Sequence, residues 1–171
     1  TLYENCIFEN NNQSSAIMCS SGLVHKHTFH NCYIRKNEIN LGSNYESSSG
    51  VYISGGSISD FISFDECHFI SNKGNNCGGA FSIEKCSCAV LIVNSEFISN
   101  SADNGGSIFI RGVYQSEEQK RIEIIGCIFT KCNGHNGSCI YSTTSQFILE
   151  DSTFCNNYIN SFDENSNVSL I

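Results

Sequence analysis

Cys67-His68-Phe69-Ile70-Ser71-Asn72 has the form Cys-x-Phe-x-x-Asn, and variants of this hexapeptide recur along the whole chain. One other copy keeps every position, two open on Ser, one has Ile in place of Phe, and one ends on Cys. Six copies of one pattern predict a solenoid in which each copy belongs to one rung. The other copies span residues 6–11, 32–37, 95–100, 127–132 and 152–157.

Apolar residues around the hexapeptide alternate with the period of a β-strand. Counted from the opening Cys or Ser, they stand mostly at five and three residues upstream and at two residues downstream. Residues i and i+2 of a strand share a face, so the change of phase just before the Cys predicts a bend between two short strands. The downstream aromatic column is Phe8, Ile34, Phe69, Phe97, Phe129 and Phe154.

A third strand is predicted after each Asn, where small residues precede an apolar-x-apolar pattern. Gly78-Gly79-Ala80-Phe81-Ser82-Ile83 shows it best. Small residues suit a tight turn or a close approach of a neighbouring backbone. Segments 38–46 and 113–121 fall outside the columns and are expected to protrude as loops. The other copies of the third strand are 14–19, 48–53, 105–110 and 136–141.

Three short strands per repeat of about 25 to 35 residues predict an all-β parallel β-helix of about six rungs. An antiparallel two-sheet sandwich is the competing fold, but it gives no reason for one residue type to recur at one place in every repeat. Stacked rungs about 4.8 Å apart would place like residues over one another. Residues 1–171 then form a single segment, which we expect to be part of a longer repeat protein.

The recurring Asn has a physical reason in such a stack. A side-chain amide can donate to one neighbour and accept from the other, and Asn tolerates the left-handed backbone that tight turns need. Cys132 breaks the column in the fifth rung. The predicted ladder is Asn11, Asn37, Asn72, Asn100 and Asn157.

Charge and composition exclude some partners. The net charge is −8 with nine Lys and Arg, which disfavours nucleic acid and anionic membranes. No apolar run is long enough to span a bilayer. The eleven cysteines fit either thiols or metal ligands in a cytosolic protein or some disulfides in an exported one. Sequons at Asn12, Asn136 and Asn167 favour the extracellular or cell-surface alternative.

The cysteines fall into two groups. Cys6, Cys32 and Cys67 open successive hexapeptides, so neighbours could bridge, but small buried thiols are the favoured interpretation. Cys77, Cys86 and Cys88 fall near predicted turns and are the better candidates for disulfides. Cys86-Ser87-Cys88 is a weaker candidate for metal binding, because no second ligand pair stands at a suitable spacing.

Other polar residues carry little chemistry. His25, His27 and His30 cluster, but a partly buried structural role for His27 is favoured over metal binding. Asp65 and Glu66 are the best acids, yet the predicted outward columns offer neither glycosidase-type carboxylate pairs nor a calcium cluster. Ile70 and Ile98 would form an outward apolar strip suited to a lateral contact or to covering a loop.

The pairing of Phe-x-x-Asn with Gly-Gly-Ala-apolar resembles the repeat of the polymorphic outer membrane protein family, known from chlamydial autotransporters and similar to repeats in protist surface proteins. Phe69-Ile70-Ser71-Asn72 followed by Gly78-Gly79-Ala80-Phe81 carries the resemblance, and residues 97–100 with 105–108 come next. The resemblance implies an extracellular, right-handed, pectin-lyase-like β-helix used in adhesion or as a surface stalk. It implies no catalytic residues and no cofactor.

The sequence therefore predicts a non-enzymatic extracellular structural or adhesive module. Its expected partners are neighbouring segments of the same chain or further copies of itself, with glycans or cell-surface proteins as further candidates. A carbohydrate-binding or carbohydrate-cleaving β-helix is the alternative, supported mainly by analogy of fold.

Overall fold

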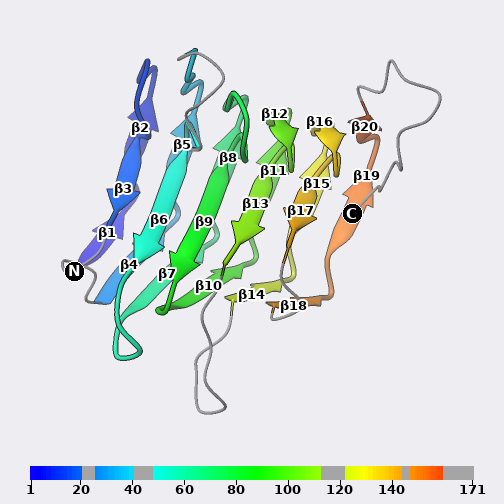
Figure 1. Cartoon of the computed structure of the whole chain (residues 1–171). Helices are drawn as coiled ribbons and strands as arrows, with labels where there is room; N and C mark the ends of the chain where they lie inside the picture. Colours follow the sequence, from blue (N-terminus) through cyan, green and yellow to red (C-terminus); the bar gives the residue numbers. More distant parts are fainter. Residues whose placement is uncertain (21–25, 41–47, 113–121, 144–146, 160–171) are drawn as a thin grey trace.

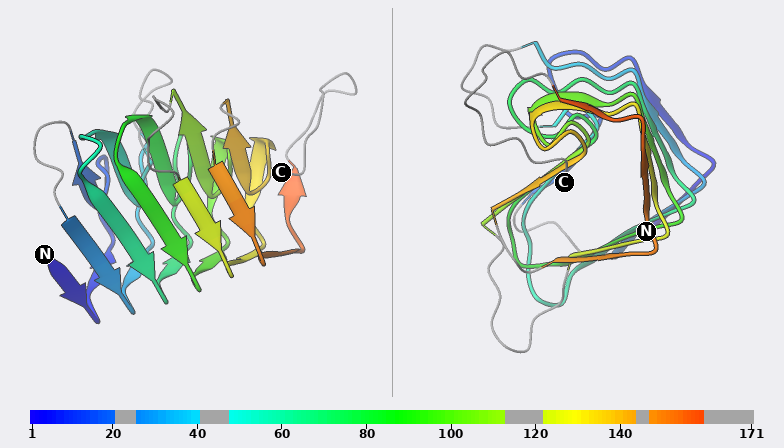
Figure 2. Two further views of the ribbon diagram at one scale, coloured as in Figure 1. Left: turned by 90° about the horizontal axis from the view of Figure 1, so that it is seen from below. Right: turned by 90° about the vertical axis from the view of Figure 1, so that its right-hand side faces the viewer.

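The computed structural model describes residues 1–20, 26–40, 48–112, 122–143 and 147–159. Within these ranges the chain forms short β-strands and no helix, and the strands pair in parallel. Figure 1 shows successive coils following one another along the molecule, and the end-on view of Figure 2 shows them winding around one shared interior. The fold is a parallel β-helix, and the antiparallel sandwich is excluded.

Two six-stranded sheets contain the strands on either side of the predicted bend. The first sheet consists of β1 (Leu2–Glu4), β4 (Lys26–His30), β7 (Phe61–Asp65), β10 (Ala89–Val93), β14 (Ile122–Ile125) and β18 (Phe147–Glu150). The second sheet consists of β2 (Ile7–Glu9), β5 (Tyr33–Arg35), β8 (His68–Ile70), β11 (Glu96–Ile98), β15 (Ile128–Thr130) and β19 (Thr153–Cys155).

The small-residue segments lead into a third sheet, and the last three coils add a short fourth one. The third sheet consists of β3 (Ile17–Cys19), β6 (Val51–Gly55), β9 (Phe81–Cys86), β13 (Ile108–Arg111) and β17 (Ile140–Ser142). The fourth sheet, which was not predicted, consists of β12 (Ser101–Asn104), β16 (Asn133–Asn136) and β20 (Tyr158–Ile159).

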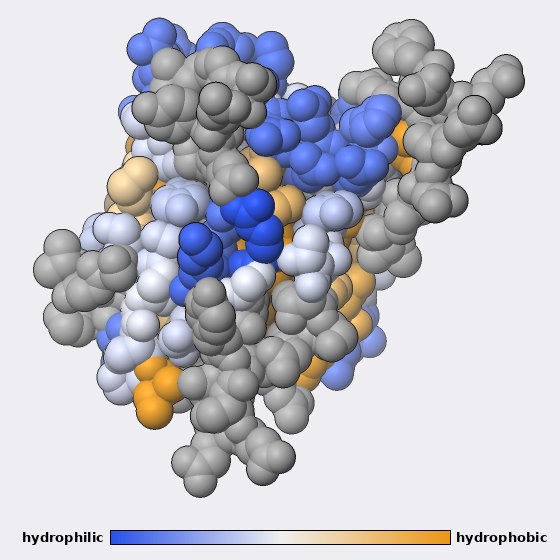
Figure 3. Space-filling view, viewed as in Figure 1, coloured by the Kyte–Doolittle hydropathy of each residue, from blue (hydrophilic) through white to orange (hydrophobic). Residues whose placement is uncertain are grey.

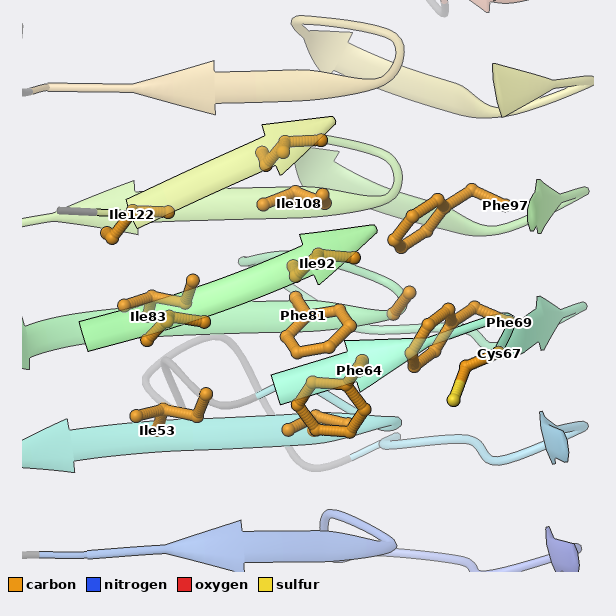
Figure 4. Packing of buried hydrophobic residues seen from close by; sticks show 14 of the residues in the cluster. Ile53, Phe64, Cys67, Phe69, Phe81, Ile83, Ile92, Phe97, Ile108 and Ile122 are labelled. Atoms are coloured by element: carbon orange, nitrogen blue, oxygen red, sulfur yellow. The ribbon is translucent and has the colours of Figure 1, made fainter. Parts of the chain in front are cut away.

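The core is a set of columns in which equivalent residues of neighbouring coils lie over one another. Phe69 pairs in register with Phe97, which pairs with Phe129, and all three side chains are fully buried. Their ring centroids are 4.8 Å and 4.6 Å apart and the rings are nearly parallel. Phe81 packs against Phe69 from the third sheet, as Figure 4 shows. Offset aromatic stacking therefore runs along the coil axis in addition to the burial of apolar area.

Two corners in every coil have left-handed backbone. At the first corner, φ lies between 48° and 64° in the residue just before the opening Cys or Ser. At the second corner, φ lies between 54° and 57° in the residue just before the ladder Asn. The prediction that the ladder Asn itself takes this conformation was wrong, because its side chain points into the coil while the preceding residue makes the bend. The second-corner residues are Asn10, Lys36, Ser71, Ser99, Lys131 and Asn156.

The third strand of the fifth coil is shifted by one residue from its predicted position. Ile108 pairs with Ile140, so the segment equivalent to 105–110 is 137–142 rather than 136–141. Gly137 has φ of 65° and occupies the place of Gly105, whose φ is 60°. A shift of one residue exchanges the two faces of a strand. Tyr141 therefore points outward, where its ring stacks on Phe109.

The predicted loops are described only in part. Residues 41–46 and 113–121 lie outside the described residues, and so does His25. The first residues of the predicted loop 38–46 are part of the coil. The Glu38 backbone forms parallel β-bridges with Asn12 and Lys73, and the Ile39 side chain is buried.

Candidate functional site

The asparagine ladder is the most extensively bonded feature of the interior. The buried Asn72 Nδ2 donates to Ile34 O at 2.7 Å and to Asn100 Oδ1 at 3.1 Å. Its Oδ1 accepts from Asn37 Nδ2 at 2.9 Å and from Asn37 N at 3.2 Å. One side chain thus satisfies four hydrogen bonds and joins three coils.

The same arrangement extends in both directions from Asn72. Asn11 Nδ2 donates to Asn37 Oδ1 at 2.9 Å, and Asn157 Oδ1 accepts from Cys132 N at 2.9 Å. Cys132 replaces the amide in the fifth coil, and its Sγ donates to Phe97 O at 3.4 Å. The structure therefore brings the predicted ladder residues together and places a thiol donor at the interruption.

The opening Cys or Ser of each hexapeptide supports the first corner through its side chain. Cys67 Sγ donates to Asp65 O at 3.4 Å, and Ser95 Oγ donates to Val93 O at 2.7 Å. Ser95 Oγ also accepts from Cys67 N at 3.0 Å, so this bonding continues into the next coil. The exchange of Cys for Ser between repeats is the sequence signal for this shared hydrogen-bond donor.

All eleven cysteines are thiols in the structure. Cys32, Cys67 and Cys127 are buried, and Cys6 is half-buried. Burial raises the pKa of the Cys67 thiol to about 12 and that of the Cys127 thiol to about 11. These thiols therefore keep the proton that they donate to the corner carbonyls.

Raising the pH above 9 is expected to destabilise the fold. Unfolded thiols titrate near pKa 9.0, whereas Cys67 in the folded state titrates at about 12. Between these values the unfolded state binds fewer protons, so the free energy of unfolding falls as pH rises. Urea unfolding at pH 8 and pH 10.5 measures the effect, and Cys67→Ser should reduce the slope. Cys155→Ser, which removes an exposed thiol, is the matched control.

The outward faces carry ion pairs that join neighbouring coils. Each carboxylate contacts a basic group one coil away, so the pairs join neighbouring coils laterally, although ion pairs exposed to solvent add little to stability. The exposed pairs are Glu9 with Arg35 at 2.7 Å and Glu38 with Lys73 at 2.8 Å. Glu96 Oε2 also lies within hydrogen-bond distance of His68 Nδ1, at 3.0 Å.

An ion pair with a nearly buried carboxylate lies on the outward face of the third sheet. The Glu84 side chain is 5% exposed, and its Oε2 accepts from Arg111 Nη2 at 2.8 Å. Ser82 Oγ donates to Glu84 Oε1 at 2.9 Å, and the Arg111 guanidinium lies 5.5 Å from the centroid of the Phe109 ring. Apolar and polar residues alternate along residues 81–84, which predicts that Ser82 and Glu84 face outward. Nothing in the sequence predicts that these two outward side chains are buried.

The predicted acids lie at the first corner of the third coil. Asp65 Oδ2 is 3.5 Å from His30 Nδ1, and Glu66 Oε2 is 3.9 Å from His30 Nε2. Asn94 Nδ2 donates to Asp65 Oδ1 at 3.2 Å. Two carboxylates thus share one partly exposed imidazole. In the described part of the chain, no group of three or more His, Cys, Asp or Glu side chains is arranged to hold a metal ion.

The other predicted residues have mainly packing roles. His27 is half-buried, with its ring centroid 6.0 Å from that of Tyr3. Ile70 and Ile98 pair in register as expected, but both are half-buried rather than fully exposed. The Cys77 side chain is buried, and the Cys77 backbone forms an isolated parallel β-bridge with Asn104.

The three sequons differ in their surroundings. Asn12 and Ser14 are both exposed. Asn136 Nδ2 donates to Asn104 Oδ1 at 2.8 Å, and Ser138 is buried. Asn167 lies outside the described residues. A glycan on Asn12 is compatible with the fold, whereas one on Asn136 would have to displace the bond to Asn104.

Comparison of the chain with protein families, with curated proteins and with solved structures found no match. The resemblance to polymorphic outer membrane proteins therefore stays a prediction. The described residues include no helix suited to crossing a membrane.

Proposed function

We propose that the chain is a non-enzymatic structural or adhesive β-solenoid module that acts outside the cell or on its surface. The observation that carries the proposal is the ladder through Asn72, in which one buried amide bonds to the coils on both sides. Such bonding suits a protein whose task is to hold a stiff shape. The parallel backbone pairing of the strands in each sheet adds further bonds between neighbouring coils.

Several surface features support the same function. The charged groups described above are used in ion pairs between coils. Figure 3 shows that hydrophilic residues cover much of one face and that hydrophobic residues appear there in small patches. A surface of this kind suits a soluble spacer or a platform for weak lateral contacts. Glycans or cell-surface proteins are the external partners that we propose.

Neighbouring segments of the same chain or further copies of it are the other proposed partners. β1 and β18 are the outermost strands of the first sheet, and each pairs on one side only within the described chain. An edge strand can accept another strand through its backbone groups. Added coils would lengthen the same columns.

A carbohydrate-active β-helix is the second candidate. The contact between Asp65 and His30 on an outward corner is the observation that favours it, because this pair could position a sugar hydroxyl or move a proton. Fold alone does not decide between the two functions.

Assays on polysaccharides separate the two candidates. Purified protein is incubated with polygalacturonate and with neutral glycans, with and without Ca²⁺, and new reducing ends and unsaturated products are measured. The scaffold function predicts no turnover, together with end-to-end assembly that electron microscopy should show as elongated particles. Turnover that Asp65→Ala abolishes, while the unfolding midpoint stays unchanged, would establish the enzyme instead.

Glycosylation tests the proposed location. When the chain is expressed in a eukaryotic secretory pathway, we expect a glycan on Asn12 and none on Asn136, because the Asn12 side chain is exposed whereas the Asn136 side chain donates to Asn104. Intact mass before and after glycosidase treatment measures the sugar. Asn12→Gln should remove one glycan, and Asn136→Gln, made in an Asn167→Gln background, is the control. A secreted chain without sugar on Asn12 contradicts the prediction.

A further inference from the structure

Two cysteines occupy the shortest connection between the third and first sheets. β9 ends at Cys86 and β10 begins at Ala89, so only Ser87 and Cys88 separate the strands. The corresponding connections one coil earlier and one coil later span residues 56–60 and 112–121. The corner is therefore tightest at the place where the two cysteines stand.

The turn holds the two sulfur atoms against each other. Cys86 Sγ lies 2.7 Å from Cys88 Sγ, closer than the roughly 3.5 to 4.0 Å of ordinary contact between heavy atoms. Ser87 N donates to Gly55 O at 3.1 Å, which attaches the turn to the preceding coil. Gly56 leaves room for Cys88, because a Cβ at Gly56 would lie 3.2 Å from the Cys88 Cβ.

The surroundings make the two thiols chemically unequal. The two thiols share one hydrogen bond in which either sulfur can be the donor, and this contact lowers the pKa of Cys86 and raises that of Cys88. Burial raises the pKa of both groups, and the nearby Asp60 carboxylate raises both further. Hydrogen bonding thus favours the thiolate at Cys86, and the thiolate is the nucleophile in disulfide exchange.

We propose that Cys86 and Cys88 form a disulfide across Ser87 by exchange with a low-molecular-weight disulfide such as oxidised glutathione. The Cys86 thiolate attacks one sulfur of the reagent, forms a mixed disulfide and releases one thiolate. Cys88 then loses its proton and attacks the Cys86 sulfur, which releases the second thiolate. The protein dithiol is oxidised, the reagent is reduced to two thiols, and these take up the two protons that the cysteines lose.

Access governs when the exchange occurs. Cys86 is fully buried and Cys88 is 2% exposed, so the reagent reaches them before the corner closes during folding or when the corner opens. We expect the reduced folded protein to react at least ten times more slowly than the protein in urea. The proposal does not depend on the scaffold function, and either can fail without the other.

Tryptic mapping tests the pair directly. Cleavage after Lys85 and Arg111 yields a peptide of residues 86–111 whose only cysteines are Cys86 and Cys88. The reduced chain is refolded in a buffer of reduced and oxidised glutathione, quenched with acid, unfolded, alkylated with N-ethylmaleimide and digested. We expect this peptide to carry no alkyl group and to have lost two hydrogens, while peptides containing Cys32 and Cys67 are alkylated.

Two alkyl groups on the 86–111 peptide after refolding in excess oxidised glutathione would overturn the proposal. A link from Cys86 or Cys88 to another cysteine would overturn it as well. This readout uses the unmodified chain, so it does not depend on whether a variant folds. Cys77→Ser is the matched control and should leave the Cys86–Cys88 disulfide in place, whereas Cys88→Ser should leave Cys86 alkylated or bound to glutathione.

Discussion

Gly105→Ala is expected to destabilise the protein by more than about 4 kcal/mol, a loss large enough to prevent folding at ordinary temperatures. Gly105 has φ of 60°, and a Cβ there would lie within 2.0 Å of Ile108 O, a backbone atom that cannot move aside. Left-handed backbone alone costs a residue with a side chain roughly 1 to 2 kcal/mol. The collision with the third strand accounts for the rest.

Gly112→Ala is the matched control for this prediction. Gly112 has φ of 59°, but the nearest atom to an added Cβ is Lys85 Cγ at 3.6 Å. Only the conformational cost should remain, about 1 to 2 kcal/mol. Urea unfolding followed by circular dichroism compares the two variants. Similar losses in both would show that close packing at Gly105 does not matter.

Asn72→Ala is expected to reduce the free energy of unfolding by about 3 to 5 kcal/mol. The change leaves Ile34 O and the Asn37 amide groups without their partner in a buried place. Each buried group left unsatisfied costs about 1 to 3 kcal/mol. The denaturation midpoint, with an unchanged slope against urea concentration, measures the loss.

Asn11→Ala serves as the comparison for Asn72→Ala. Asn11 lies in the first described coil and is only partly buried, so water can replace its bonds. We expect a loss of about 1 kcal/mol there. A loss at Asn72 no greater than that at Asn11 would mean that the ladder adds little to the backbone pairing.

The columns could be predicted from sequence because each coil repeats the same chemistry at the same spacing. Phe69 over Phe97 and Asn72 over Asn100 follow from aligning hexapeptides, with no knowledge of distances. The alignment of the third strands was wrong in the fifth coil, where two neighbouring residues are both suited to the turn. Gly137 and Asn136 both suit a turn, and only the left-handed φ of Gly137 decides the register.

Features of the candidate site were harder to predict, because they depend on three-dimensional proximity. Glu84 and Arg111 are 27 residues apart, and the loops between coils vary in length. The meeting of Cys86 and Cys88 depends on how short that corner is, which the sequence pattern does not show. The role of Cys67 and Ser95 as side-chain donors to the corner carbonyls could have been predicted from the sequence, because this position alternates between two residue types that can donate a hydrogen bond.

The ladder amides all point the same way along the axis. Asn11, Asn37 and Asn72 each donate from Nδ2 to the Oδ1 of the Asn that follows. In these amide-to-amide bonds each Asn donates to the next Asn and accepts from the one before, which gives the ladder a polarity. A reversed coil would set donor against donor, so any coil joined to this one, whatever its origin, must run in the same sense. A stack lengthened by further coils would therefore have all its coils running in one direction.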